Sequence, residues 1–134
     1  MTELDPEEFL ARGKAFPEFP LDLTSERIVA YRSATGDLAT PENLAPPAAI
    51  LALSLEPLLA DLTLLKGAIH TGQELRMHRV VAIGERLTAR VTVANSSLRG
   101  GAVFAAIDQV VLDESSKVVL EGRSNVIVAR DEAS

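Results

Sequence analysis

One carboxylate in the sequence, that of Asp37, is a candidate for proton transfer. Asp37 directly follows Gly36, at the end of segment 31–37, which reads Tyr-Arg-Ser-Ala-Thr-Gly-Asp. A carboxylate can act as a general acid or base towards a bound substrate. An aspartate after a glycine can equally hydrogen-bond the backbone and cap a turn. The next histidine in the chain is His70, so Asp37 has no histidine close by in sequence.

The histidines do not predict a metal site. The chain has 2 histidines, His70 and His78, and no cysteine. Zinc sites need more ligands at closer spacing, commonly with thiolates among them, so no metal is expected. His78 precedes Arg79 in a strand-like segment, and we expect it to contact a neighbouring strand or an interface.

The composition indicates one acidic globular domain. The chain has 134 residues, 47% of them hydrophobic and 24% charged, with a formal net charge of −6. These values suit a single domain over 1–134. Nucleic acids bind basic surfaces, so no nucleic-acid partner is expected. The acidic N-terminus lacks the features of a signal peptide, and we expect a cytoplasmic protein without disulfides.

The start of the chain predicts a short helix and a proline-rich arm. Residues 5–8 have the capping and proline pattern of a helix start. Residues 16–20 contain two prolines and predict an extended arm that lies outside any sheet. A short strand is expected at 21–23.

Two longer helices are predicted next. The first covers about 24–35. Its apolar face is expected to comprise Ile28, Val29 and Tyr31. The second covers 48–65, which is apolar at most positions. Its two acids and its proline make this segment too polar and too broken to cross a bilayer. It is therefore predicted to be a buried central helix, which ends or kinks around 56–57.

After Gly67 the apolar pattern changes to a period of two, which is typical of strands. Strands are predicted at 73–79, from 86 onwards, at 103–113 and at 117–129. We expect them to pair in meander order. A fully buried helix beside a long antiparallel sheet implies that the sheet wraps the helix. This is the hot-dog arrangement, an α+β fold whose exposed edge strand usually pairs with a second copy.

Several short motifs in this order resemble those of the MaoC-like dehydratase superfamily. They are Gly67 to Glu74, His78-Arg79, Gly84 to Thr88 and Arg99-Gly100-Gly101 before Phe104. Within the superfamily the sequence is most similar to the N-terminal dehydratase domain of fungal fatty-acid-synthase type, over about 13–129. The resemblance implies a hot-dog fold and an acyl-thioester ligand, carried on coenzyme A or acyl carrier protein. It implies no cofactor.

The resemblance also gives segment 31–37 a catalytic meaning. R-specific enoyl hydratases of the superfamily have an aromatic residue, a small residue, Gly-Asp and then Asn-Pro-x-His. Tyr31, Thr35, Gly36 and Asp37 match the first part, whereas 38–41 reads Leu-Ala-Thr-Pro and the histidine is missing. In the family, the acid and the histidine activate a water that adds across an enoyl double bond, or leaves in the reverse reaction. Water must lose a proton while the α-carbon gains one, so a single carboxylate is poorly suited to both transfers.

The resemblance implies a set of site residues. Asp37 is the expected acid–base group. His70 lines the acyl-thioester tunnel, replaces the missing base or makes a structural hydrogen bond. Substrate contacts are expected from Tyr31, Gly36, Ala48, Ala49 and Arg79. The arginines of the sheet half either balance nearby acids on a solvated face or meet the phosphates of coenzyme A or a carrier arm.

Three functions remain open. The first is a lyase of fatty acid metabolism, an R-specific enoyl hydratase or 3-hydroxyacyl-thioester dehydratase, acting as a homodimer or heterodimer. The second is a non-catalytic hot-dog subunit whose partner chain supplies the complete motif. The third is a thioesterase in which Glu56 activates water and backbone N–H groups at the helix start hold the oxyanion. Pro46 and Pro47 leave Ala48 and Ala49 as donors there.

Overall fold

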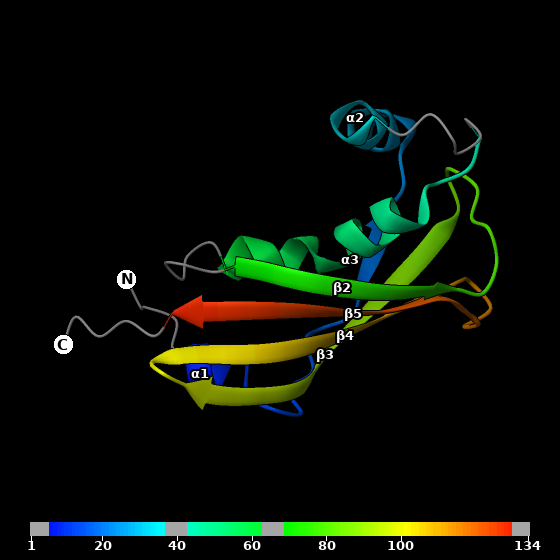
Figure 1. The fold of residues 1–134 in the computed structure, drawn as a ribbon. Helices are drawn as coiled ribbons and strands as arrows, with labels where there is room; N and C mark the ends of the chain where they lie inside the picture. The colour runs from blue at the N-terminus through cyan, green and yellow to red at the C-terminus, as the bar shows by residue number, and fades with distance from the viewer. Residues whose placement is uncertain (1–5, 37–42, 63–68, 130–134) are drawn as a thin grey trace.

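The structure, a computed structural model, describes residues 6–36, 43–62 and 69–129. Its elements in chain order are α1 (Pro6–Phe9), β1 (Phe19–Asp22), α2 (Ser25–Thr35), α3 (Pro47–Leu62), β2 (Ile69–Met77), β3 (Arg86–Arg99), β4 (Ala102–Leu112) and β5 (Val118–Ala129). The strands form one antiparallel sheet in the order β1-β3-β4-β5-β2. Helix α3 lies along one face of this sheet (Figure 1). The predicted α+β hot-dog fold, a long sheet around a central helix, is confirmed.

The strand order corrects the predicted meander. Strands β3, β4 and β5 follow one another as expected, but β2 pairs with β5 at the far edge of the sheet. The place beside β3 is taken by β1, where Phe19 pairs with Ala89 and Asp22 with Arg86. The proline-rich arm is therefore partly inside the sheet, contrary to the prediction. Pro20 is tolerated there because β1 is an edge strand.

Helix α2 begins and ends at specific capping residues. The Thr24 side chain accepts a hydrogen bond from the Arg27 N–H at 3.2 Å, which caps the start of the helix. Ile28 is fully buried, whereas Val29 is 57% exposed. The prediction that Val29 belongs to the apolar face is therefore wrong. Only part of one side of this short helix faces the core, so an apolar residue beside Ile28 points to solvent.

Helix α3 is one continuous helix, not the predicted pair of segments that break around 56–57. A proline removes one helical hydrogen bond, and packing of the helix against the sheet outweighs that loss. Among the side chains of residues 47–55, those of Ala49, Ile50, Leu51, Ser54 and Leu55 are buried. No helix in the described part of the chain is long and apolar enough to span a membrane.

The side chain of Leu51 on α3 lies directly against Gly122 of β5. A Cβ atom added to Gly122 would collide with the side chain of Leu51. Glycine at this position therefore lets α3 lie directly on the strand. The close approach also shows that the Gly122 position faces α3, and that its neighbour Glu121 faces the opposite, outer side.

Candidate functional site

The end of α2 places the predicted motif at a sharp turn. Gly36 has a left-handed backbone (φ 70°), and its N–H donates to the Arg32 carbonyl at 2.9 Å. The Thr35 hydroxyl donates to the Tyr31 carbonyl at 3.0 Å. These contacts end the helix at Gly36. Asp37 lies outside the described residues, so its role as the acid–base group stays a prediction.

Tyr31 and Ala49 are brought to the same part of the core. Ala49 is fully buried, and Tyr31 is partly buried against the hydrophobic cluster that contains Ala49. Met77, at the end of β2, packs against this cluster too. In Figure 1, α2 lies above the N-terminal end of α3. The structure thus joins two of the predicted substrate-contact residues at one end of the molecule.

Some of the first backbone N–H groups of α3 already donate hydrogen bonds. The N–H groups of Ala49 and Ile50 both donate to the Pro46 carbonyl, at 3.0 and 3.2 Å. Pro46 and Pro47 have no N–H to offer. Among the described residues the Ala48 N–H has no such acceptor, so it is the free donor at this end. The Ala45 N–H, just before the helix, donates to the Val81 carbonyl at 2.8 Å, which ties this end to the segment between β2 and β3.

His70 lies at the opposite end of α3 from Tyr31. It is the second residue of β2, it is exposed, and its Cα atom pairs with Val126 of β5. Val126 belongs to the cluster around Leu55, further along α3, and not to the cluster that Tyr31 touches. Figure 1 shows β2 beginning at the far end from α2. Within one chain, His70 is therefore not beside the end of α2.

Arg79 is held by two carboxylates. It donates to both oxygens of Glu85, at 2.8 and 3.1 Å, and to Asp113 at 3.3 Å. Glu85 also accepts the Ala82 N–H at 2.8 Å. Asp113 accepts the N–H groups of Lys117 and Ser115, at 3.0 and 2.9 Å. Arg79 thus joins the segment before β3 to the turn between β4 and β5, and its predicted substrate contact stays a prediction.

These contacts shift the ionisation of the cluster. The hydrogen bond from Arg79 and then that from the Ala82 N–H lower the pKa of Glu85. The Lys117 N–H, followed by Arg79, lowers the pKa of Asp113. The bond to Glu85 raises the pKa of Arg79. All three groups therefore stay charged at neutral pH.

Most of the other arginines in the sheet half also pair with acids on the outer side of the sheet. Arg123 binds Asp108 through two contacts, at 2.7 and 3.1 Å. The further ion pairs are Arg90–Glu18 at 2.9 Å and Arg86–Glu114 at 3.7 Å. His78 contacts Glu121 of β5 at 2.7 Å, the neighbouring-strand contact that was expected. For these residues the balanced, solvated face is the arrangement observed.

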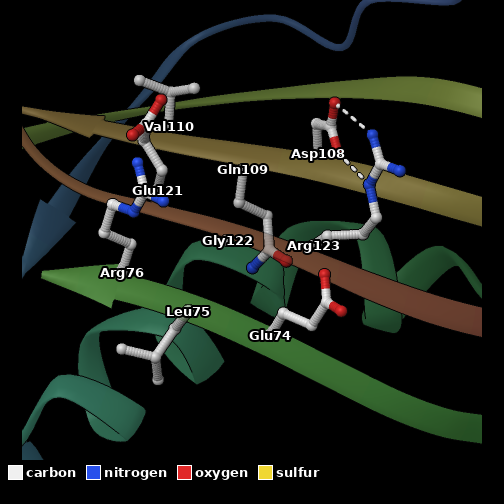
Figure 2. Close-up of a pocket in the computed structure, with 9 residues that line it drawn as sticks. All are labelled: Glu74, Leu75, Arg76, Asp108, Gln109, Val110, Glu121, Gly122 and Arg123. Carbon is white, nitrogen blue, oxygen red and sulfur yellow. Dashed lines mark hydrogen bonds and ion pairs between the residues drawn. The ribbon is translucent and has the colours of Figure 1, made fainter.

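The outer face is hollowed between β2, β4 and β5. The hollow has a volume of about 540 Å³ and is open to solvent. Figure 2 shows the residues that line it: Glu74, Leu75, Arg76, Asp108, Gln109, Val110, Glu121, Gly122 and Arg123. Within the described chain, Arg76 makes no ion pair or hydrogen bond through its side chain.

A buried polar group was not predicted from the sequence. Ser54, Gln109 and Ser124 are all fully buried. The Gln109 amide donates to the Leu51 carbonyl at 3.0 Å and to the Ser54 hydroxyl at 2.7 Å, and the Ser124 hydroxyl donates to Gln109 at 2.6 Å. The signal that could have found it is a glutamine at an inward position of β4, between Ile107 and Val111. Metal ligands do not gather in the described ranges, where no group of three acids or histidines could hold an ion.

Several solved structures have the same architecture. The MaoC-like dehydratase from Rhodospirillum rubrum has a TM-score of 0.68 and 21% identity, covering 96% of this chain and 98% of that chain. The HadBC (3R-hydroxyacyl-ACP dehydratase) complex from Mycobacterium tuberculosis has a TM-score of 0.67 and 18% identity, covering 87% and 96%. The R-hydratase PhaJ1 from Pseudomonas aeruginosa has a TM-score of 0.66 and 21% identity, covering 90% and 83%.

Sequence comparison adds nothing to this likeness. No protein-family model matches the chain, and no curated protein matches its sequence. At these identities the structural likeness concerns the fold, because unrelated functions can share one fold. The strand order and the central helix define the fold, and the likeness to these three structures supports it. The chain has the hot-dog fold of the MaoC-like dehydratases.

Proposed function

We propose that this protein binds acyl thioesters carried on coenzyme A or acyl carrier protein. The reaction proposed for it is R-specific hydration of an enoyl thioester, or the reverse dehydration of a 3-hydroxyacyl thioester. Structures with this fold include an R-hydratase and a 3R-hydroxyacyl-ACP dehydratase. The observation that carries the proposal is the end of α2, where left-handed Gly36 is followed directly by Asp37.

In the proposed reaction, the protein positions water and the thioester together. The Asp37 carboxylate takes a proton from water, the water oxygen forms a bond to the β-carbon, and the protonated carboxyl returns this proton to the α-carbon, so that the H and OH of one water add across the double bond. The enoyl double bond becomes a single bond, and no oxidant or cofactor is consumed. The Ala48 N–H, at the start of α3, is available to hydrogen-bond the thioester carbonyl as negative charge develops there. Tyr31 shapes the same end of the core.

A second candidate is a non-catalytic subunit. It is favoured by the sequence after Asp37, which reads Leu-Ala-Thr-Pro and has no histidine before His70. One structure of similar fold is a complex named for two different components, HadBC. In this alternative the chain shapes the acyl site and a different hot-dog chain supplies the acid–histidine pair.

The thioesterase alternative has less support. Thioester cleavage needs at least two N–H groups at a helix start that donate to the developing oxyanion. The Ala49 N–H already donates to Pro46, which leaves Ala48 alone. The Glu56 side chain lies outside the described residues.

The test is hydration of crotonyl-coenzyme A by the purified chain, followed by loss of the enoyl absorbance. We expect the wild-type chain to turn over, and Asp37→Asn to lower kcat by about 10²- to 10⁴-fold, because the proton-transfer group is removed. Glu26→Gln is the matched control, since it changes an acid to an amide in the first turn of α2.

The outcomes separate the candidates. Turnover that is lost in Asp37→Asn and kept in Glu26→Gln supports the hydratase. A wild-type chain that binds crotonyl-coenzyme A without converting it supports the non-catalytic subunit. If the chain neither binds nor converts the crotonyl thioester, whether on coenzyme A or on acyl carrier protein, the proposed ligand class is wrong. Release of free coenzyme A would instead support the thioesterase.

A further inference from the structure

The segment between β2 and β3 holds the chain just before α3. The Ala45 N–H donates to the Val81 carbonyl at 2.8 Å, and the Ile83 N–H donates to the Asn43 carbonyl at 3.0 Å. These bonds pair the two stretches of chain antiparallel. In Figure 1 the connection from β2 to β3 lies beside the N-terminal end of α3. Because α3 begins almost directly afterwards, at Pro47, this pairing sets where the helix starts.

The start of α2 is attached to the same segment. The Gly84 N–H donates to the Leu23 carbonyl at 3.2 Å. Leu23 is buried, and the next residue, Thr24, caps α2. One short segment therefore holds the N-terminal ends of both helices that carry residues of the proposed site.

The carboxylate of Glu85 fixes the shape of this segment. One of its oxygens accepts the Ala82 N–H at 2.8 Å, and the Glu85 N–H donates back to the Ala82 carbonyl at 3.3 Å. Arg79 donates to both carboxylate oxygens, at 2.8 and 3.1 Å. Paired contacts of this kind fix the orientation of a carboxylate as well as its position. Glu85 and Arg79 thus close the segment into a defined turn.

A single peptide group connects Glu85 to the chain before α3. The Ala82 N–H and the Val81 carbonyl belong to the same planar peptide unit, in which they point in opposite directions. Glu85 accepts the N–H of this unit, and Ala45 donates to its carbonyl. The carboxylate therefore sets the direction of the carbonyl that holds Ala45. Hydrogen bonds arranged in such a chain also strengthen one another.

We propose that Glu85 is a positioning residue of the proposed site. Its carboxylate orients the peptide group between Val81 and Ala82, and that group holds the start of α3 so that the Ala48 N–H stays in place. This role rests on the proposed function, in which Ala48 donates to the thioester carbonyl. Glu85 itself does not touch the substrate.

The expected effect falls on the chemical step. A donor to a developing oxyanion acts more on the transition state than on the bound substrate, so its displacement should lower kcat more than it raises KM. A displacement of about 1 Å can cost roughly 10²-fold in rate. Val81 is fully buried, so its packing should keep the segment folded when the carboxylate is removed.

The proposal also gives Arg79 a role that differs from substrate contact. Arg79 holds the Glu85 carboxylate and acts on the site through it. Removing Arg79 should then cost nothing further once Glu85 has been removed, because residues that act as one unit are not additive. An arginine that bound the phosphates of coenzyme A would instead raise the KM for the thioester in either background.

The first measurement is NMR of protein labelled with 15N-alanine, which does not depend on turnover. In Glu85→Ala we expect the Ala45 amide to exchange with solvent about tenfold faster, because its acceptor is no longer held, and the Ala48 resonance to move. The Ala105 amide, in the central strand β4, reports opening of the whole fold and should change less. Glu114→Ala is the matched control, since Glu114 makes only a longer, highly exposed contact with Arg86 at 3.7 Å.

The second measurement is hydration of crotonyl-coenzyme A. Glu85→Ala should lower kcat by about tenfold or more, with a smaller change in KM. Glu85→Gln keeps one acceptor oxygen and should lose less. The double variant Arg79→Gln, Glu85→Ala should match Glu85→Ala, and Glu114→Ala should match the wild type.

Each result decides a different point. An unchanged Ala45 exchange rate and Ala48 resonance in Glu85→Ala would overturn the proposal, as would an unchanged kcat. Losses that multiply in the double variant would show that Arg79 acts on the ligand directly. A wild-type chain without turnover would reject the proposed reaction, and the NMR result would then decide alone whether Glu85 positions the start of α3.

Discussion

The side-chain amide of Gln109 donates to the backbone carbonyl of Leu51 at 3.0 Å, a hydrogen bond that joins the middle of the sheet to the middle of the central helix. The contact lies where the core divides. On β4, Ile107 belongs to one hydrophobic cluster and Val111 to the other, with Gln109 between them. Leu51 and Leu55 of α3 are divided in the same way, with Ser54 between them. A polar layer thus crosses the core and fixes α3 on the sheet.

Replacing one polar side chain of this layer should destabilise the protein more than replacing all three. Gln109→Leu keeps most of the volume but leaves the buried Ser124 hydroxyl without its acceptor. A buried polar group without a partner costs about 1–3 kcal/mol, and the free energy of unfolding should fall by that amount in urea denaturation. The triple variant Gln109→Leu, Ser54→Ala, Ser124→Ala removes all three polar groups and should recover part of the loss. A triple variant less stable than Gln109→Leu would contradict this account.

The contact of Gly122 with Leu51 predicts a second effect on stability. Gly122→Ala forces a methyl group into the Leu51 side chain, and such overpacking should lower the free energy of unfolding by about 1–3 kcal/mol. Gly72→Ala on β2 is the matched control, because its Cβ would lie 3.9 Å from the Asn125 side chain, an ordinary contact. The double variant Leu51→Ala, Gly122→Ala should lose less free energy of unfolding than the two single variants lose in sum. Additive losses would show that the two positions do not touch.

The fold was largely predictable because its signals are local. The alternation of Leu87, Ala89, Val91 and Val93 marked β3, and all four are buried. The pair Gly100-Gly101 is typical of a turn and lies between β3 and β4. Each of these patterns depends on near neighbours in the sequence, so each could be found without knowledge of the rest of the chain.

The errors came from contacts between distant segments. The place of β2 beside β5 depends on β1 having taken the place beside β3, and no local pattern encodes that choice. The exposure of Val29 depends on how α2 lies on the core. The site was less predictable than the fold for the same reason: Tyr31 and Ala49 share a cluster only through the packing of α2 near α3.

The Arg79 cluster predicts a change in stability at acid pH. The pKa of Glu85 is lowered from its ordinary value of 4.5 by Arg79 and the Ala82 N–H. A lowered folded-state pKa stabilises the protein above the unfolded-state pKa, and this contribution is lost as the pH falls through the folded-state pKa. Glu85→Gln should therefore be less stable than wild type at neutral pH. The difference should shrink steadily below about pH 4.5.

The measurement is the urea midpoint of both proteins across the acid range. Glu114→Gln is the control, because Glu114 and Arg86 form a longer, highly exposed pair at 3.7 Å. Such surface pairs contribute little, so this variant should follow the wild type at each pH. A Glu85→Gln difference that stays constant with pH would mean that ionisation of the cluster does not stabilise the fold.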